Sequence, residues 1–287
     1  MRSASISRNV AAAALTGLVA GALATMAISD SADPPADDQH ATTVLDLRDN
    51  DSWSLVDLTH ALSPDSLFWP NGEPFEHERQ GWEFDADGNW YAMARFSTPE
   101  HLGTHLDAPI HFSATGWTSA QIPPERFLGP AVVVDISARA AVEIDSTLQP
   151  SDLEAWEARH GAIPESSILL VRTRWSERWP NWNSYYGSDD AFDTTTLHFP
   201  GVSAEAARAI VDRGVVGVGI DTASIDPGSD IAFSAHRVLA AANIFNLENL
   251  TGLDALPEDG AMLLALPIKI ADGTGGPTRV LGVVPSR

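Results

Sequence analysis

The sequence has 287 residues, contains no cysteine, and has a single lysine, Lys269. Without cysteine the chain can form no disulfide, thiolate metal site, catalytic thiol or lipoprotein anchor. Any metal ion must therefore be bound by histidine, aspartate, glutamate or backbone oxygen. Basic side chains are scarce overall, and the formal net charge of −22 argues against nucleic acid or an anionic membrane surface as a partner.

Charged side chains are also absent from residues 10–28, a run rich in alanine and leucine that follows Arg2 and Arg8. This pattern predicts that residues 1–28 form a signal peptide or, because the run is close to the length of a membrane span, an N-terminal membrane anchor. The polar residues 29–42 predict a disordered linker, and residues 43–287 a single domain. We therefore expect an exported protein, periplasmic or extracellular.

The remaining sequence alternates between short aliphatic runs and amphipathic stretches, which predicts a mixed α and β fold of the α/β class. Strands are predicted over residues 131–136, 167–172, 215–220 and 262–270, and helices over 152–160 and 203–213. Ser203 is the expected N-cap of the helix over 203–213 and Gly214 its stop, while Pro150 and Ser151 are expected to cap the helix over 152–160.

Two segments are interpreted as insertions between these elements. Residues 76–96 contain the turn-forming cluster 85–89 and predict a hairpin. Residues 174–199 have little aliphatic content and many aromatic side chains, among them Trp175, Trp179, Trp182, Tyr185 and Tyr186. Such a segment could cover a core, line a pocket or form a subunit contact, and the sequence leaves these three roles open.

Residues 101–112 read His-Leu-Gly-Thr-His-Leu-Asp-Ala-Pro-Ile-His-Phe, and the polar His101, His105, Asp107 and His111 are all at odd positions. Alternate side chains of an extended chain share one face, so these four groups could point the same way. Imidazole nitrogen and carboxylate oxygen are ligands of zinc, manganese and iron. A single histidine usually has no role beyond structure, but three histidines and one aspartate that all occupy odd positions favour a metal site.

The backbone of this segment is expected to be extended and sharply bent. A helix of the HExxH protease type is disfavoured by Gly103, and the position of its catalytic glutamate is occupied by Leu102. A straight strand would place His101 and His105 roughly 13 Å apart, too far for both to bind one ion. Gly103 is well placed for the bend.

Three ligands, His101, His105 and Asp107, would leave coordination positions open for water, which is the arrangement of a catalytic metal site. His111 is left over. It could reach the site without binding the ion, which suits a group that carries protons.

At these residues the chain resembles the cyclase family of metal-dependent hydrolases, which includes bacterial kynurenine formamidases and isatin hydrolases. Residues 101–111 match the family's core motif H-x-G-[TA]-H-x-D-x-P-x-H throughout. The resemblance spans roughly residues 53–284 and also includes Phe68-Trp69-Pro70, the run from Gly219 to Asp226, Ala235-His236, Glu248 and Leu266-Pro267-Ile268-Lys269.

The resemblance implies a β/β/α swivelling-domain fold, a homodimer or homotetramer, and one or two Zn²⁺ or Mn²⁺ ions. It implies that His101, His105 and Asp107 bind the first ion and His236 a second. Asp107 and Glu248 would bridge the pair.

The same resemblance implies an amidohydrolase that uses metal-activated water. The substrate would be a small aryl formamide, such as N-formylkynurenine, or a cyclic amide, such as isatin. His111 would be the general acid and base, and Trp69 would contact the substrate. The export segment, the two insertions and Phe-Trp-Pro-Asn-Gly in place of the usual Trp-Pro-Gly-Asp bear on the choice of substrate.

Two other functions stay open on the sequence. The same site could serve a lactone or ester hydrolase, or an exported binding protein that keeps the metal without catalysis. Asp221 is interpreted as a loop cap together with Thr222 and Ser224. Residues 273–277 are rich in glycine, but no helix follows them, so a phosphate-binding loop is not expected.

Overall fold

The computed structural model describes residues 52–190 and 192–286, so the predicted targeting segment, the linker and the domain start at residue 43 lie outside it. Among the described residues, no helix is long and apolar enough to cross a membrane. The large sheet contains β1 (Trp53–Asp57), β4 (His105–Asp107), β5 (Leu128–Asp135), β7 (Ile168–Arg172), β9 (Gly217–Ile220), β10 (Phe245–Glu248), β11 (Ala261–Pro267) and β12 (Gly275–Pro285).

The large sheet closes on itself. Its strand order is β1-β12-β11-β5-β7-β9-β10-β4, and β12 pairs a second time with β4, which gives a barrel-like ring. The neighbours β5, β7, β9 and β10 are parallel, whereas the other pairs are antiparallel. Because β4 lies between β10 and β12, the predicted metal motif is held by two strands from the end of the chain.

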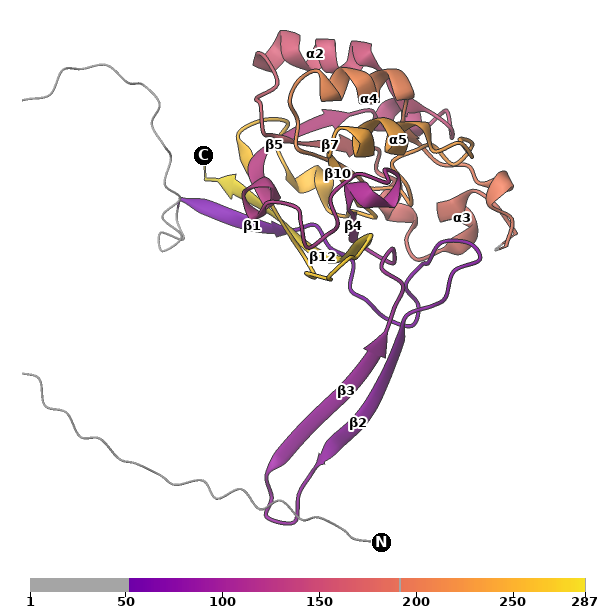
Figure 1. The fold of residues 1–287 in the computed structure, drawn as a ribbon, viewed down its shortest axis with the longest axis vertical. Coiled ribbons are helices and arrows are strands. Elements are labelled where there is room, and N and C mark those ends of the chain that lie inside the picture. Colours follow the sequence, from indigo (N-terminus) through magenta and orange to yellow (C-terminus); the bar gives the residue numbers. More distant parts are fainter. Residues whose placement is uncertain (1–51, 191, 287) are drawn as a thin grey trace, which may run out of the picture. The chain divides into compact units, whose positions relative to one another are not determined.

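Helices cover one face of the parallel strands (Figure 1). The helices are α1 (Ser137–Ala140), α2 (Pro150–His160), α3 (Trp182–Tyr186), α4 (Ala204–Val211) and α5 (Ser234–Ala241), with 3₁₀ turns η1 (Pro109–His111), η2 (Pro124–Phe127), η3 (Trp175–Arg178), η4 (Thr194–Thr196) and η5 (Leu253–Ala255). Ser203 caps α4 as predicted, accepting a hydrogen bond from the Ala206 amide. The predicted cap of α2 was wrong, because Gln149 forms a capping box with Asp152.

Strand β5 shows how the core is divided. Val132 and Val134 pack against α2, α4 and α5, whereas Ala131 and Val133 point into the barrel. A strand buried on both faces has no polar side to alternate with, which explains its uninterrupted aliphatic sequence. The predicted mixed α and β architecture of the swivelling type is confirmed.

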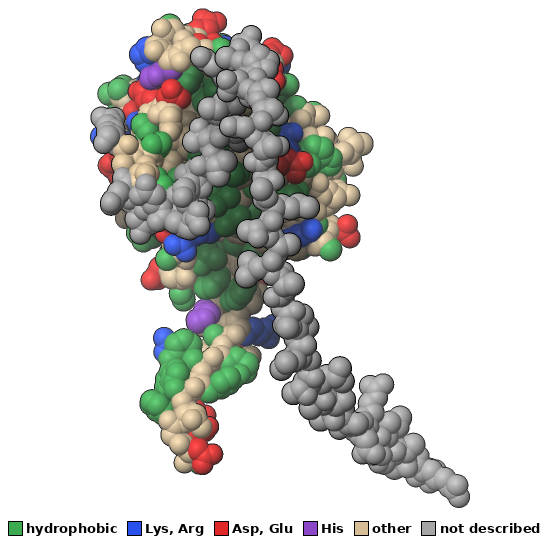
Figure 2. All heavy atoms as spheres, turned by 90° about the vertical axis from the view of Figure 1, so that its left-hand side faces the viewer, with side chains coloured by type: hydrophobic (Ala, Val, Ile, Leu, Met, Phe, Trp, Pro, Cys, Tyr) green, Lys and Arg blue, Asp and Glu red, His purple; other side chains and the backbone are tan. Residues whose placement is uncertain are grey.

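The predicted hairpin consists of β2 (Glu76–Phe84) and β3 (Trp90–Ser97), which pair with each other and with no other strand of the described residues (Figure 1). Every residue of the two strands is exposed except Gly81, which is half-buried. The register places four large side chains on one side, here called the apolar face: Trp82, Phe84, Trp90 and Phe96. Figure 2 shows apolar side chains gathered along this hairpin.

The aromatic insertion covers a small core of its own. The side chains of Trp175, Tyr185 and Tyr186 are buried together with Leu67 and Phe199. The short strand β8 (Gly201–Val202), which follows the insertion, pairs in parallel with β6 (Thr147–Leu148). Of the three predicted roles, covering a core therefore holds, and the site below adds the lining of a pocket.

Candidate active site

The metal motif is bent at Gly103, as predicted. Gly103 has a φ of 62°, and a Cβ at this position would lie 2.7 Å from the Leu62 side chain. Only His105 and Asp107 share a strand face, because Pro109 turns the chain into η1 and places His111 there. The extended part is thus shorter than the sequence suggested.

The three donors of the motif meet at one carboxylate. The distance from His101 Nδ1 to Asp107 Oδ1 is 2.6 Å, and that from His105 Nε2 to the same oxygen is 3.1 Å. His105 and Asp107 are buried, whereas the His101 side chain is 24% exposed toward the cavity. The bend therefore brings together groups that a straight strand would hold apart.

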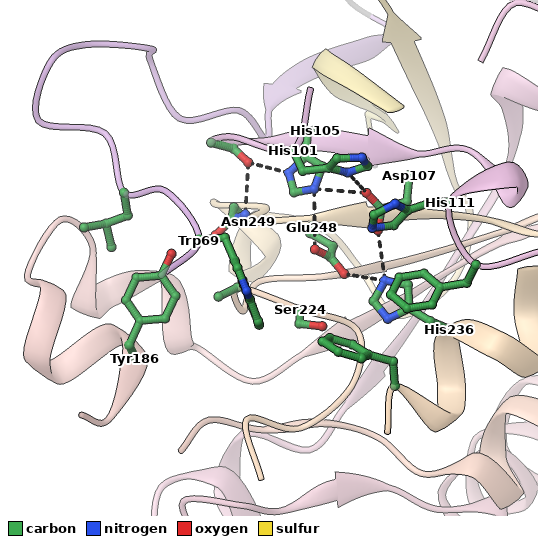
Figure 3. Close-up of a pocket in the computed structure, with 15 residues that line it drawn as sticks. Trp69, His101, His105, Asp107, His111, Tyr186, Ser224, His236, Glu248 and Asn249 are labelled. Carbon is green, nitrogen blue, oxygen red and sulfur yellow. Dashed lines mark hydrogen bonds and ion pairs between the residues drawn. The ribbon is translucent and has the colours of Figure 1, made fainter. Parts of the chain in front are cut away.

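Two donors from far along the chain complete the cluster (Figure 3). Glu248 ends β10 and pairs in register with His105 on β4. His236 Nε2, from α5, lies 2.9 Å from Asp107 Oδ2 and 3.2 Å from Glu248 Oε1, and His105 Nε2 lies 3.5 Å from Glu248 Oε2. The structure thus places all five residues proposed as metal ligands in one cluster.

Burial and the two carboxylates act in opposite directions on the histidines. Burial by itself lowers the pKa of His105, but Asp107 and Glu248 outweigh it and raise the pKa to about 9. The pKa of His236 is likewise raised against its burial, by hydrogen bonds to Asp107, Asp226 and Glu248. These carboxylates attract positive charge into a buried space, which a divalent cation would supply as well as protons do.

The donor set fits divalent metal ions. Ligating atoms of His101, Asp107 and His111 lie within 4.8 Å of one another, and so do those of His105, Asp107 and Glu248. Nitrogen and carboxylate oxygen without thiolate suit zinc or manganese. Asp107 belongs to both groups, which is the position of a bridging ligand.

The outer nitrogens of two of these histidines are also held. His105 Nδ1 lies 2.8 Å from the Gly103 carbonyl oxygen, and His236 Nδ1 lies 2.6 Å from Asp226 Oδ2. Such partners orient a ligating imidazole and fix the nitrogen that it offers to the metal. Asp226 was not among the predicted site residues, although it ends the Gly219–Asp226 run that carries part of the family resemblance.

His111 stacks on His101, with ring centroids 3.9 Å apart and an angle of 21° between the planes. Burial against its neighbours, together with the nearby His101, outweighs Asp107 and lowers the pKa of His111 to about 4. The ring is therefore neutral near pH 7 and able to accept a proton. A ring nitrogen of His111 also lies within 4.8 Å of ligating atoms of His101 and Asp107, within reach of the same ion.

A cavity of about 280 Å³ opens over the cluster. Trp69, which the resemblance implies to be a substrate contact, lies in its wall and packs edge-on against Tyr186 and at a tilt against Phe233. Phe112 and Phe233, which were not among the predicted site residues, also line it. Phe112 directly follows the motif, a position that could have drawn attention to it.

Asp221 lies close to the cluster, but its carboxylate forms hydrogen bonds within the neighbouring loops. Its Oδ1 accepts hydrogen bonds from the Thr173 amide at 3.0 Å and the Thr173 hydroxyl at 2.6 Å. Burial raises the pKa of Asp221 to about 6. This arrangement agrees with the interpretation as a structural cap.

A family model described as "Putative cyclase" matches residues 56–227, more than half of the chain. The chain belongs to the cyclase family. The isatin hydrolase of Roseibium aggregatum is 34% identical to this cyclase-family chain over 212 residues, which cover 71% of this chain and 79% of the relative. A kynurenine formamidase of Bacillus thuringiensis is 28% identical over 226 residues, covering 79% and 95%.

Solved structures agree with this assignment. Isatin hydrolase A of Ralstonia solanacearum superposes with a TM-score of 0.74 at 37% sequence identity, covering 81% of this chain and 92% of that structure. The predicted family resemblance is confirmed, and the cyclase-family chain is a hydrolase.

Proposed function

We propose that this hydrolase cleaves the C–N bond of an aryl formamide, such as N-formylkynurenine, or of a cyclic amide, such as isatin. One observation carries the proposal: three histidines and two buried carboxylates converge beneath an aromatic-lined cavity. The activities named for the relatives, isatin hydrolase and kynurenine formamidase, support the same reaction class.

His101, His105 and Asp107 would hold one divalent ion, and His236 a second, with Asp107 and Glu248 shared between them. The cofactor is one or two Zn²⁺ or Mn²⁺ ions. When bound, such an ion supplies Lewis-acid polarisation and lowers the pKa of water.

The chain's own residues provide proton transfer and orientation. His111, neutral near pH 7, accepts a proton as water attacks the carbonyl carbon and returns it to the leaving nitrogen. Trp69, Phe112 and Phe233 give the cavity apolar walls that suit a flat ring. These aromatic walls also exclude water from the rest of the substrate.

A homodimer or homotetramer is part of the proposal, and a second copy of this chain is the partner that fits the hairpin. The apolar face exposes four large side chains, Trp82 at 46%, Phe84 at 67%, Trp90 at 52% and Phe96 at 56%, and a group of exposed aromatic side chains of this kind marks an interaction surface. Arg79 is its one charged side chain and lies over the Trp82 ring at 4.5 Å, whereas the chain as a whole is strongly acidic. A second copy would therefore offer a surface of complementary charge.

Export to the periplasm or cell exterior also remains a proposal, based on residues 1–28. Fractionation of cells that express the full chain, with N-terminal sequencing of the mature protein, distinguishes a cleaved signal peptide from a retained anchor.

The decisive experiment combines metal analysis of purified protein with a substrate panel of N-formylkynurenine, isatin and a dienelactone. We expect one or two equivalents of zinc or manganese and turnover of at least one amide. Preference for the lactone would favour the ester or lactone hydrolase. Metal without turnover of any amide, imide or lactone would favour a binding protein.

A further inference from the structure

The glycine-rich residues 273–277 pack against the His101 ring and form a hydrogen bond with it. Thr274 precedes β12, and its hydroxyl oxygen lies 2.8 Å from His101 Nε2. A Cβ on the next residue, Gly275, would lie 2.7 Å from His101 Cε1 and 2.5 Å from the Leu106 carbonyl oxygen. Glycine at this position therefore allows the imidazole to lie against the strand.

Glu100 determines where the Thr274 hydroxyl donates its hydrogen. Glu100 Oε2 accepts the backbone amide of Thr274 at 2.8 Å and its hydroxyl at 2.5 Å. A carboxylate only accepts hydrogen bonds, so the single hydroxyl hydrogen is committed to Glu100. The lone pairs that remain on the oxygen require a hydrogen on His101 Nε2.

Because of this arrangement, His101 turns Nδ1 toward the cluster, whereas the other two histidines turn Nε2 toward it. His105 and His236 have their Nδ1 atoms held by Gly103 and Asp226, and they turn Nε2 toward the carboxylates. In His101 the outer nitrogen is Nε2, and Nδ1 faces the cluster. The difference follows from the acceptor on the outer side, because the nitrogen that carries the hydrogen is unavailable to a metal.

We propose that Glu100 and Thr274 are positioning residues that keep the hydrogen of His101 on Nε2 and thereby commit Nδ1 to the metal. This inference rests on the proposed function only in taking His101 as a metal ligand. It gives a role to the glycine-rich residues 273–277, which are not a phosphate-binding loop and contain none of the proposed catalytic groups.

The test is zinc affinity of the full chain, measured by competition with a chelator. Thr274→Val keeps the shape of the side chain and removes the hydroxyl, so we expect roughly 10-fold weaker zinc binding or more. Thr274→Ser should restore the affinity. Glu100→Ala frees the hydroxyl hydrogen to turn either way and should weaken binding by a smaller factor.

Thr278→Val is the matched control. Thr278 lies on β12, the strand that Thr274 precedes, is buried, and donates its hydroxyl to the Gly276 carbonyl rather than to the cluster. Its zinc affinity should equal that of the wild type. Thermal unfolding of the metal-free proteins should show similar losses for Thr274→Val and Thr278→Val, which separates positioning from stability.

A second readout is ¹⁵N NMR of zinc-loaded protein with labelled histidine. We expect one zinc-bound histidine to carry its hydrogen on Nε2, and Thr274→Val to perturb that signal. Equal zinc affinity in Thr274→Val and the wild type, or binding of every histidine through Nε2, would overturn the inference alone. A wild type that binds no zinc or manganese would overturn the metal-site proposal as well.

Discussion

The metal-donor cluster and the β2–β3 hairpin depart in opposite directions from the usual division between polar surface and apolar interior. In the cluster, the side chains of His105, Asp107 and His236 are 3–4% exposed. In the hairpin, Phe84 is 67% and Trp90 52% exposed. Buried charge and exposed aromatic surface are both unfavourable unless something else binds them. The first calls for a cation and the second for another apolar surface, so the two regions should respond to different changes.

The largest effect is expected where the cluster is most connected. Asp107 lies against three histidines, and Asp107→Asn removes the charge that they share. We expect loss of bound metal and a fall in turnover of roughly 10³-fold or more. Metal content and steady-state rates measure both.

A matched control for this change is Asp145→Asn. Asp145 pairs with His198 on the surface, outside the cluster. Metal content and turnover should stay at wild-type values there. Full metal stoichiometry in Asp107→Asn would contradict the assignment of Asp107 as the shared ligand.

The next largest effect separates ligation from proton transfer within the cluster. His111→Ala should keep the metal and lower kcat by about 10²–10⁴-fold, because it removes the group that moves the proton. Metal analysis of the same preparation decides the alternative. Loss of metal would make His111 a ligand and end its role as proton carrier.

The buried and exposed carboxylates should differ in the pH dependence of stability. Burial raises the pKa of Asp221 to about 6, so the folded protein holds that proton more tightly than the unfolded chain does. Stability from this group is present at low pH and is lost as pH rises from about 4 to 6, by about 3 kcal/mol for a shift of about two units. The Asp221→Asn variant has no titratable group at this position, so the stability of the wild type relative to that variant should fall by the same amount.

Denaturant unfolding at pH 4, 5, 6 and 7 measures this difference. The hairpin offers the contrasting control: hydrogen bonds from Asn89 lower the pKa of the exposed Asp85. The stability that Asp85 contributes is lost only as pH falls below the ordinary pKa of an aspartate. The difference in unfolding free energy between the wild type and Asp85→Asn should therefore stay constant between pH 5 and 7. A flat profile for Asp221→Asn would show that its carboxylate is not penalised by burial.

The smallest effect on the folded chain is expected in the hairpin. Trp82→Ser with Phe84→Ser removes half of the apolar face but no core contact, so unfolding of the isolated subunit should change by about 0.5 kcal/mol or less. The proposed homo-oligomer, measured by light scattering, should dissociate to smaller species. Tyr91→Ser with Met93→Ser alters the opposite face and should leave the oligomer intact. Dissociation by both pairs equally would argue against a contact specific to the apolar face.

Much of this fold was accessible from local sequence. The aliphatic runs that became β5, β7, β9 and β11 were recognisable because buried strands leave no place for polar residues. Ser203 and Gly214 marked α4 through capping chemistry that depends on a few neighbouring residues. The predicted Ser151 cap was wrong because Gln149 and Asp152 form a capping box instead. Several neighbouring residues in this segment have side chains that could cap the helix.

The site divides in a similar way. His101, His105, Asp107 and His111 were identified by type and spacing within one segment. His236 and Glu248 required a family resemblance, because nothing in their own surroundings marks them as partners of Asp107. Phe112 and Phe233 went unselected, since an aromatic residue beside a pocket looks the same in sequence as one in a core.

The sequence by itself determined the donor chemistry, the bend at Gly103 and the absence of thiolate ligands, because these depend on residue type and on neighbouring backbone. The tertiary structure decided which nitrogen His101 offers, through Thr274, and which carboxylate the histidines share. Those outcomes depend on β4 being seated between β10 and β12, a pairing of segments more than 100 residues apart. Distances across such pairs follow from strand order and register, which no short stretch of sequence specifies.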